Sequence, residues 1–313
     1  MEGNLFYIGL AQNTNYFNIG RDLATINAKN EEVVDREGHV AGYLCNIRVS
    51  GDAAARISFL TAPNTWKMRN AVRKAHFLRQ EMFRDAGITL SEQGKYGRTL
   101  RPHLTTAQVS DGVYKDPYYV APAVDSPSGA GTVANYTGGE WSYTTLASSP
   151  SWDNTPLVDH DGLPLADTYT IAICGPNREQ DDEGGVKSWN TIGLINSYNL
   201  DRMEQVPDAT ADTSISGMNN PFAMLKSQSV VSGEVAEIAE DQQLEAPPYD
   251  VADAGDSIQL LYNTMTITNS TESVRNLSLF VPAGLFAITS TAALTSAGIT
   301  VDVVGKVLCK DMA

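Results

Sequence analysis

Four histidines, His39, His76, His103 and His160, are the side chains of this chain best suited to proton transfer near neutral pH. None of them belongs to a known catalytic motif. The sequence has no nucleophile elbow, no phosphate-binding loop and no paired-histidine zinc helix. Acidic residues are abundant, so a carboxylate pair for glycoside hydrolysis stays open as an alternative. We therefore expect a protein that is not an enzyme and uses no cofactor.

Two short acidic segments could collect a cation. Asp159–Gly162 matches the acid-x-acid-Gly pattern of part of a calcium-binding loop, but the full twelve-residue ligand spacing is absent. Asp181–Glu183 precedes two glycines, which is typical of a solvated turn. We expect polar turns at both places and no metal site.

The three cysteines, Cys45, Cys174 and Cys309, are odd in number and far apart in the sequence. They match no zinc spacing and no disulfide framework. The sequence therefore predicts buried, reduced thiols.

Charge is distributed unevenly along the chain, which has 22 basic and 37 acidic residues and a net charge of −15. Residues 56–101 hold ten basic residues against three acids, whereas residues 178–256 hold sixteen acids against four bases. A chain this acidic is not expected to coat nucleic acid with its whole surface. The dipolar pattern favours packing of copies side by side, acidic region against basic region, and the alternative is a solvated surface.

Short runs of alternating apolar and polar residues dominate the chain and predict half-buried strands. We expect about nine or ten strands, joined by loops rich in Gly, Pro, Ser, Asn and Asp. The expected strand regions lie near Phe6 and Thr99 and at Tyr43–Val49, Arg56–Phe59, Trp141–Leu146, Tyr169–Ile173, Trp189–Tyr198, Ile258–Thr268, Leu277–Val281 and Ile299–Cys309, the last interrupted by Gly305.

One segment, Asn64–Ala86, departs from this pattern and predicts an amphipathic helix capped by Asn64 or Thr65 and ended at Gly87. Arg79 falls within its apolar stripe, so we expect it to reach the edge of the stripe or to meet a buried acid. A shorter acidic helix is expected at Glu234–Leu244. The opposite face of the long helix carries the candidate contact residues Arg69, Arg73, Lys74, Phe77 and Arg84.

Three interpretations of that outer face remain open. Arginine and phenylalanine are enriched in the cores of subunit interfaces, which favours contact with an acidic neighbour. Aromatic and cationic side chains together also bind single-stranded nucleic acid by stacking and phosphate neutralisation. The third interpretation is a solvated helix face.

The fold class expected from these elements is all-β, a jelly-roll β-sandwich with one inserted amphipathic helix at about 64–86 and long loops. The alternative is a double jelly roll, which would need roughly sixteen strands. We expect a single domain over residues 1–313, with loop-rich or projecting regions at about 105–165 and 200–256.

The chain resembles jelly-roll capsid (coat) proteins of small icosahedral viruses, and most closely those of small circular single-stranded DNA viruses. The resemblance covers about half of the chain and involves no diagnostic motif. The segments that carry it are TAPNTWKMRNAVRKAHFLRQEMFRDAG at Thr61–Gly87, GKYGRTLRP at Gly94–Pro102, APPYD at Ala246–Asp250 and LSLFVPAGLF at Leu277–Phe286.

This resemblance implies a structural protein of the virion that assembles with itself into an icosahedral shell inside the host cell. Single-stranded DNA is then an expected partner of the basic region 56–101. Coat proteins of this kind often begin with a basic arm, whereas residues 1–20 contain one acid, Glu2, and no Lys or Arg. Genome packaging would then depend on region 56–101, on another protein, or on a shell that binds its contents loosely.

The main alternative is a β-sandwich module that binds carbohydrate, and the other is a hydrolase. The aromatic platforms available for stacking on a sugar are Tyr118, Tyr119, Trp141 and Trp152. The first residues lack a basic stretch followed by a long apolar one, so no signal peptide is expected. No segment approaches the roughly 18 consecutive apolar residues of a membrane span.

Overall fold

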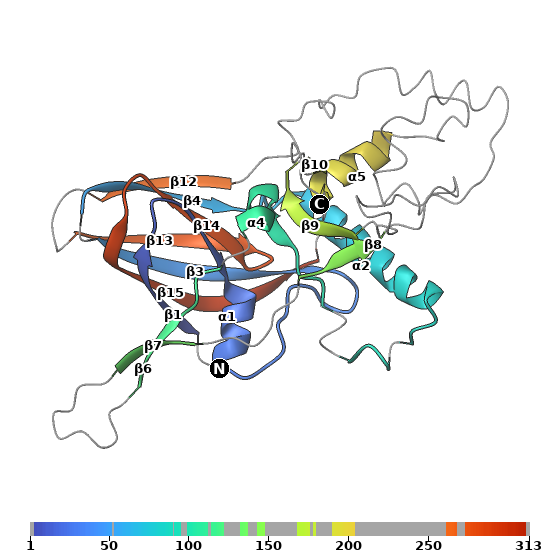
Figure 1. Ribbon diagram of the computed structural model, residues 1–313, viewed down its shortest axis with the longest axis horizontal. Helices are drawn as coiled ribbons and strands as arrows, with labels where there is room; N and C mark the ends of the chain where they lie inside the picture. The colour runs from blue at the N-terminus through green and yellow to red at the C-terminus, as the bar shows by residue number, and fades with distance from the viewer. Residues whose placement is uncertain are drawn as a thin grey trace, which may run out of the picture.

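The computed structural model consists mostly of β-strands in antiparallel sheets with few helices, which confirms an all-β fold (Figure 1). It describes residues 3–51, 53–89, 91–94, 99–111, 114–121, 132–136, 143–147, 168–175, 178–179, 190–203, 261–267 and 273–310. The expected helix at Glu234–Leu244 and most of the two expected loop regions lie outside these residues.

Eight strands form two four-stranded antiparallel sheets that face each other as a sandwich (Figure 1). The first sheet has the strand order β1-β15-β3-β13, and the second has the order β12-β4-β14-β2. The strands are β1 (Asn4–Leu10), β2 (Asn13–Asn18), β3 (Val40–Gly51), β4 (Ala55–Thr61), β12 (Leu261–Ile267), β13 (Ser273–Pro282), β14 (Leu285–Ser290) and β15 (Leu294–Cys309).

The alternation along β3 shows how the sequence selects the two faces of the first sheet. Tyr43, Cys45, Ile47 and Val49 are buried, whereas the intervening Leu44, Asn46 and Arg48 are exposed, as the period of two predicts. In β15 the pairing with β3 shifts between Val303 and Gly305, so the interruption expected at Gly305 is a β-bulge.

Aromatic rings fill the space between the two sheets. Phe17 of the second sheet is fully buried, and its ring stacks on Phe286 at 4.7 Å between centroids. The ring of Tyr7 from the first sheet meets Phe17 edge-on at 4.9 Å. These contacts join the sheets through one continuous apolar core that also contains Ile47, Ile57 and Phe59.

Helix α1 (Ile19–Ile26) connects β2 to β3, and the remaining elements lie between β4 and β12. The long helix of this insertion, α2 (Trp66–Asp85), confirms the predicted amphipathic helix. Its N-cap is Thr65, whose hydroxyl accepts a hydrogen bond from the Met68 amide at 3.3 Å. The helix ends before Gly87, where φ is +74°.

The insertion also contains a five-stranded sheet in which β9 pairs in parallel with β5 and β11. Its central strand, β9, buries Ile171 and Ile173, which belong to a second apolar cluster together with residues of α2. The elements of this part are β5 (His103–Thr105), α4 (Thr106–Asp111), β8 (Thr145–Ala147), β9 (Thr168–Cys174), β10 (Arg178–Glu179), β11 (Asn190–Gly193) and α5 (Leu194–Met203).

The strand expected over Trp189–Tyr198 is wrong in its second half, because only Asn190–Gly193 is extended and Leu194 starts α5. Leu194 and Ile195 are fully buried, and so are the consecutive residues Ile171–Cys174 of β9, because short apolar runs occur in buried strands and in buried helices and do not distinguish them. Tyr198 lies one turn further along the helix, and its ring meets Trp66 of α2 at 5.9 Å.

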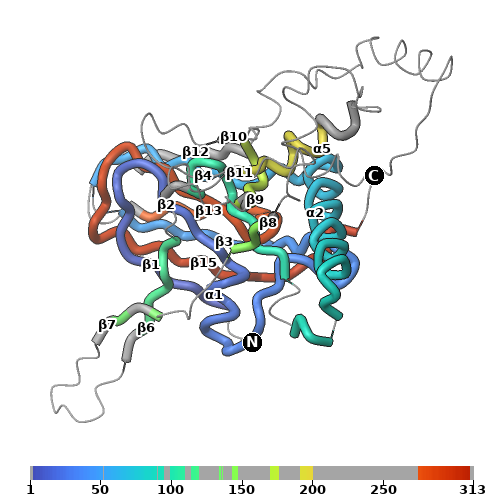
Figure 2. Tube along the Cα trace, turned by 45° about the vertical axis from the view of Figure 1, so that its right-hand side comes forward, coloured from blue at the N-terminus to red at the C-terminus, as the bar shows by residue number. Residues whose placement is uncertain are grey.

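A separate two-stranded sheet, β6 (Tyr118–Ala121) and β7 (Thr132–Asn135), projects from the body beneath β1 (Figures 1 and 2). With it, the described residues contain fifteen strands, more than the nine or ten expected. The excess includes β2 and β14, two sandwich strands that the sequence did not predict. It also includes short strands of the insertion, such as β10, which is too brief to produce a periodic pattern.

Candidate interaction surface

The outer face of α2 carries the five residues expected to make contacts, and the structure brings two of them together. The Arg73 guanidinium lies over the Phe77 ring at 5.6 Å from its centroid. Phe77 is 45% exposed, so part of its ring is open to a partner. Arg73 and Phe77 therefore form a cation–π pair at the surface.

The other three residues of this face differ in how far they are exposed. Arg69 and Lys74 are half-buried, and Arg84 is exposed and forms an ion pair with Glu81. The loop before β3 covers part of the helix, since a Cβ at Gly38 would lie 3.2 Å from Cγ of Arg73 and 3.0 Å from Cδ2 of His76. The exposed part of the face is thus centred on Phe77 rather than on Arg69.

Arg79 is half-buried, and it contacts a carbonyl and a ring rather than the buried acid that was one of the two expectations. Its guanidinium donates a hydrogen bond to the Thr99 carbonyl at 2.9 Å and lies over the Phe83 ring at 5.0 Å. Burial, together with the nearby charge of Arg101, lowers the pKa of Arg79 to about 10. Arg79 therefore fixes the segment before β5 onto α2.

A buried ion pair joins the loop after α1 to the same segment. The Arg101 Nε donates to Glu31 Oε2 at 2.6 Å, and both side chains are almost fully buried. The amide of Asn18 donates to the other Glu31 oxygen at 3.1 Å. Burial raises the pKa of Glu31, while Arg101 and Asn18 act in the opposite direction.

A second buried cluster surrounds Asp22 in α1. This carboxylate accepts hydrogen bonds from the Tyr7 hydroxyl at 2.6 Å and from Arg21 Nε at 2.9 Å. Arg21 also donates to Asp116 at 2.6 Å and to the Lys115 carbonyl at 3.1 Å. The cluster therefore connects β1, α1 and the segment that leads into β6.

Replacing Asp22 with Asn should flatten the pH dependence of stability between pH 4 and 6. Burial raises the Asp22 pKa to about 6, with Arg21 and Tyr7 opposing the rise. The folded state therefore binds a proton that the unfolded state releases, so stability should fall as pH rises from about 4 through 6. Measured by urea unfolding, the free energy of unfolding of the wild type should fall by about 2–3 kcal/mol over this interval. The D22N variant should not show this fall. Parallel pH profiles would contradict this assignment.

His103 lies in a stack of rings, 4.1 Å from Tyr143 and 6.4 Å from Tyr114 between centroids. Burial lowers its pKa to about 4, so the imidazole is neutral at pH 7. Its Nδ1 is buried without a hydrogen-bond partner among the described residues. A neutral buried imidazole of this kind contributes packing and does not match the pKa that proton transfer near neutrality requires.

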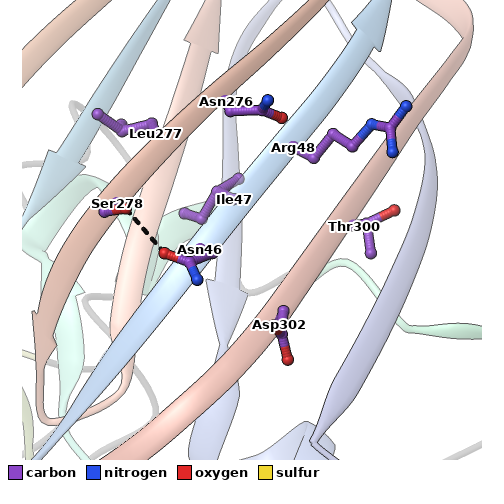
Figure 3. A pocket seen from close by; sticks show the side chains of 8 residues that line it. All are labelled: Asn46, Ile47, Arg48, Asn276, Leu277, Ser278, Thr300 and Asp302. Atoms are coloured by element: carbon purple, nitrogen blue, oxygen red, sulfur yellow. Dashed lines mark hydrogen bonds between the residues drawn. The ribbon is translucent and has the colours of Figure 1, made fainter.

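The outer face of the first sheet carries a shallow hollow of about 500 Å³ (Figure 3). Arg48 lies opposite Thr300 and Asn276, and Asn46 lies opposite Asp302 and Ser278, which donates to Asn46 at 2.7 Å. Among the residues that line this hollow, only Asp302 has a carboxylate. The hollow therefore offers hydrogen-bonding groups but not the carboxylate pair that the hydrolase alternative needs.

A carboxylate–imidazole group that the sequence did not reveal lies in the turn before β3. Asp35, Glu37 and His39 each place one potential metal-ligand atom within 4.8 Å of the others. The His39 Nδ1 lies 2.9 Å from Asp35 Oδ2, and the other Asp35 oxygen accepts from the His39 and Glu37 amides. These bonds close the turn that covers Arg73 and His76.

All three cysteines are buried and free, as predicted. Burial raises the pKa of Cys45 and of Cys174 to about 12 and also raises that of Cys309. The thiols are therefore protonated and poorly nucleophilic at neutral pH.

Several expected sites lie wholly or partly outside the described residues. The candidate cation segments at Asp159–Gly162 and Asp181–Glu183 and the candidate platforms Trp141 and Trp152 belong to this group. Tyr119 is on β6, 37% exposed, and its ring lies 4.5 Å from that of Tyr136. Tyr118 beside it is half-buried.

Among the helices that the structure describes, none is long and apolar enough to cross a membrane. No protein-family model, no curated protein and no solved structure matches this chain.

Proposed function

We propose that this protein is a coat subunit with a jelly-roll fold that assembles with copies of itself into a closed viral shell. The observation that supports it best is the pairing of the eight sandwich strands. The first pairs with the last (β1 with β15), the second with the seventh (β2 with β14), the third with the sixth (β3 with β13) and the fourth with the fifth (β4 with β12). An antiparallel hairpin of four strand pairs, rolled into two sheets, produces this order.

The position of the insertion also supports a single jelly roll rather than a double one. The eight strands of the sandwich account for both four-stranded sheets, and the described residues contain no second set of this order. Everything between β4 and β12 belongs to the connection between the fourth and fifth strands. A long insertion at one strand connection leaves the sandwich intact, because surface loops tolerate added length.

A jelly roll alone does not define a function, because lectins and cupins share it with viral coats. Self-association is supported by charge and by the α2 face. Residues 56–101 have a net charge of +7 and residues 178–256 a net charge of −12. The exposed Phe77 with its Arg73 partner supplies an aromatic and a cation of the types that anchor interfaces. In this proposal the protein acts by association, with no catalytic role and no cofactor.

The proposal places the protein in the virion after assembly inside the host cell. The basic region 56–101 is then available either to acidic surfaces of neighbouring subunits or to a single-stranded DNA genome. We favour the subunit contact, because Arg69, Arg73 and Lys74 are half-buried and present less charge to a polyanion than a solvated basic stripe does.

Reversing three charges on α2 tests the proposed interface. The triple variant Arg69→Glu, Arg73→Glu and Lys74→Glu should lose assembly while the sandwich stays folded, because like charges would then face the acidic region of the neighbour. Sedimentation velocity would show particles for wild type and single subunits for the variant, with far-UV circular dichroism as the check on folding.

The matched control reverses three exposed basic residues elsewhere, Arg48, Lys306 and Lys310, and produces the same change in net charge. Normal particles from this control would show that position rather than total charge matters. Normal particles from the α2 variant would refute the interface on that helix.

The second candidate function is a carbohydrate-binding module, and the hollow on the first sheet is the observation that favours it. Asn46, Arg48 and Asp302 supply donors and acceptors there, and Phe6 of β1, 41% exposed, lies opposite Thr300 at its edge. A monomer that binds glycans and forms no particles would favour this function over the shell.

A further inference from the structure

The hairpin β6–β7 is the part of the described structure that is hardest to explain within one isolated subunit. Its strands have four residues each and form a sheet with no third strand among the described residues. Both views show the two strands lying outside the sandwich layers (Figures 1 and 2). An isolated two-stranded hairpin is marginally stable in water, because few backbone hydrogen bonds offset the cost of ordering the chain.

The base of the hairpin, by contrast, is firmly attached to the body. The Lys115 amide donates to the Tyr16 carbonyl at 2.9 Å, and Tyr16 and Tyr114 form a parallel β-bridge. Arg21 binds the Asp116 carboxylate and the Lys115 carbonyl, and its guanidinium lies over the Tyr114 ring at 5.3 Å. These contacts fix the direction in which the hairpin leaves the sandwich.

The two ends of the hairpin meet directly at this base. The Tyr136 amide donates to the Pro117 carbonyl at 2.9 Å, which continues the pairing of β6 with β7 beyond its last strand residues. Tyr119 packs its ring on Tyr136 and remains 37% exposed. A base that is hydrogen-bonded to the body therefore carries two short strands. Strand β6 lies close to β1, but neither β6 nor β7 has a hydrogen-bonded third strand among the described residues.

We propose that β6–β7 is an assembly arm that pairs with an open sheet edge of a second copy of this chain. An unpaired strand edge is recognised by another strand edge through main-chain hydrogen bonds. The chain itself offers such edges, since β13 ends the first sheet and β12 ends the second in the described strand orders. This inference rests on the proposed function, because it assigns one of the contacts that would build the shell.

The geometry favours a contact that repeats from copy to copy. The arm projects near β1, whereas β12 and β13 are the edges at the opposite ends of their sheets from β2 and β1. The arm and the open edge are therefore different patches of one subunit. A contact between two different patches is heterologous, and such contacts build rings and closed assemblies when their rotation closes.

Excision of the arm tests this inference on the full chain. Residues 118–135 are replaced by a short Gly-rich turn, which needs no rearrangement because Pro117 and Tyr136 are already hydrogen-bonded. We expect an unchanged circular dichroism spectrum, a melting temperature close to that of wild type, and a loss of about tenfold or more in particle yield by mass photometry.

A point variant that keeps the chain length guards against indirect effects of the deletion. Tyr119→Lys adds a charge of the kind that blunts strand edges, and Thr145→Lys adds the same charge at an exposed position on β8. Only Tyr119→Lys should reduce the particle yield.

The outcomes distinguish failure of the proposed arm from failure of the proposed shell function. Wild-type particle yield from both the excision variant and Tyr119→Lys would overturn the arm while leaving the proposed function in place. A wild-type protein that stays monomeric under assembly conditions would overturn the proposed function, and the arm with it.

Discussion

Replacing Arg101 with Ala should lower the free energy of unfolding by about 3–5 kcal/mol, because it leaves the Glu31 carboxylate buried without its cation. Both side chains of this pair are almost fully buried, and the Nε–Oε2 distance is 2.6 Å. Urea unfolding at pH 7 measures the effect. The matched control is Lys306→Ala, which breaks an exposed ion pair with Glu32 and should cost no more than about 1 kcal/mol.

The double variant Glu31→Leu and Arg101→Met distinguishes the effect of the unpaired charge from the effect of lost side-chain packing. Because it removes both charges, it should be considerably more stable than Arg101→Ala alone. If Arg101→Ala were as stable as the wild type, this would contradict the assignment of Glu31 and Arg101 as a buried ion pair that holds the insertion against the sandwich.

Replacing Phe17 with Ala should also destabilise the protein by about 3–5 kcal/mol, because the ring fills the centre of the sandwich. Its ring contacts Tyr7 from the first sheet and Phe286 from the second, and the side chain is fully buried. Phe6→Ala is the control, since that ring lies on the outer face of β1 and is 41% exposed. Equal losses in denaturant unfolding from both variants would contradict the sandwich as described.

The sequence was informative where burial alternates along a single element. The run from Tyr43 to Val49 and the helix from Asn64 to Ala86 match β3 and α2, because each element displays its own period regardless of its partners. The strand predicted through Tyr198 failed where two adjacent apolar residues, Leu194 and Ile195, are both buried in a helix.

Contacts between distant residues could not be predicted in this way. Glu31 and Arg101 are 70 residues apart, so no local pattern indicates that they form an ion pair. The pairing of β4 with β12 across the insertion could not be predicted from a local pattern either, because the register depends on both strands. The turn at Gly38 similarly covers part of the basic helix, which helical spacing alone does not reveal.

The measurement that tests the shell most directly is light scattering after size exclusion, with negative-stain imaging of the same fraction of recombinant protein. The proposal predicts discrete closed particles of megadalton mass, and their ratio of absorbance at nucleic-acid and protein wavelengths would show whether nucleic acid is enclosed. A species of 33.8 kDa alone, with and without added single-stranded DNA and across ionic strengths, would contradict it and favour the carbohydrate-binding module.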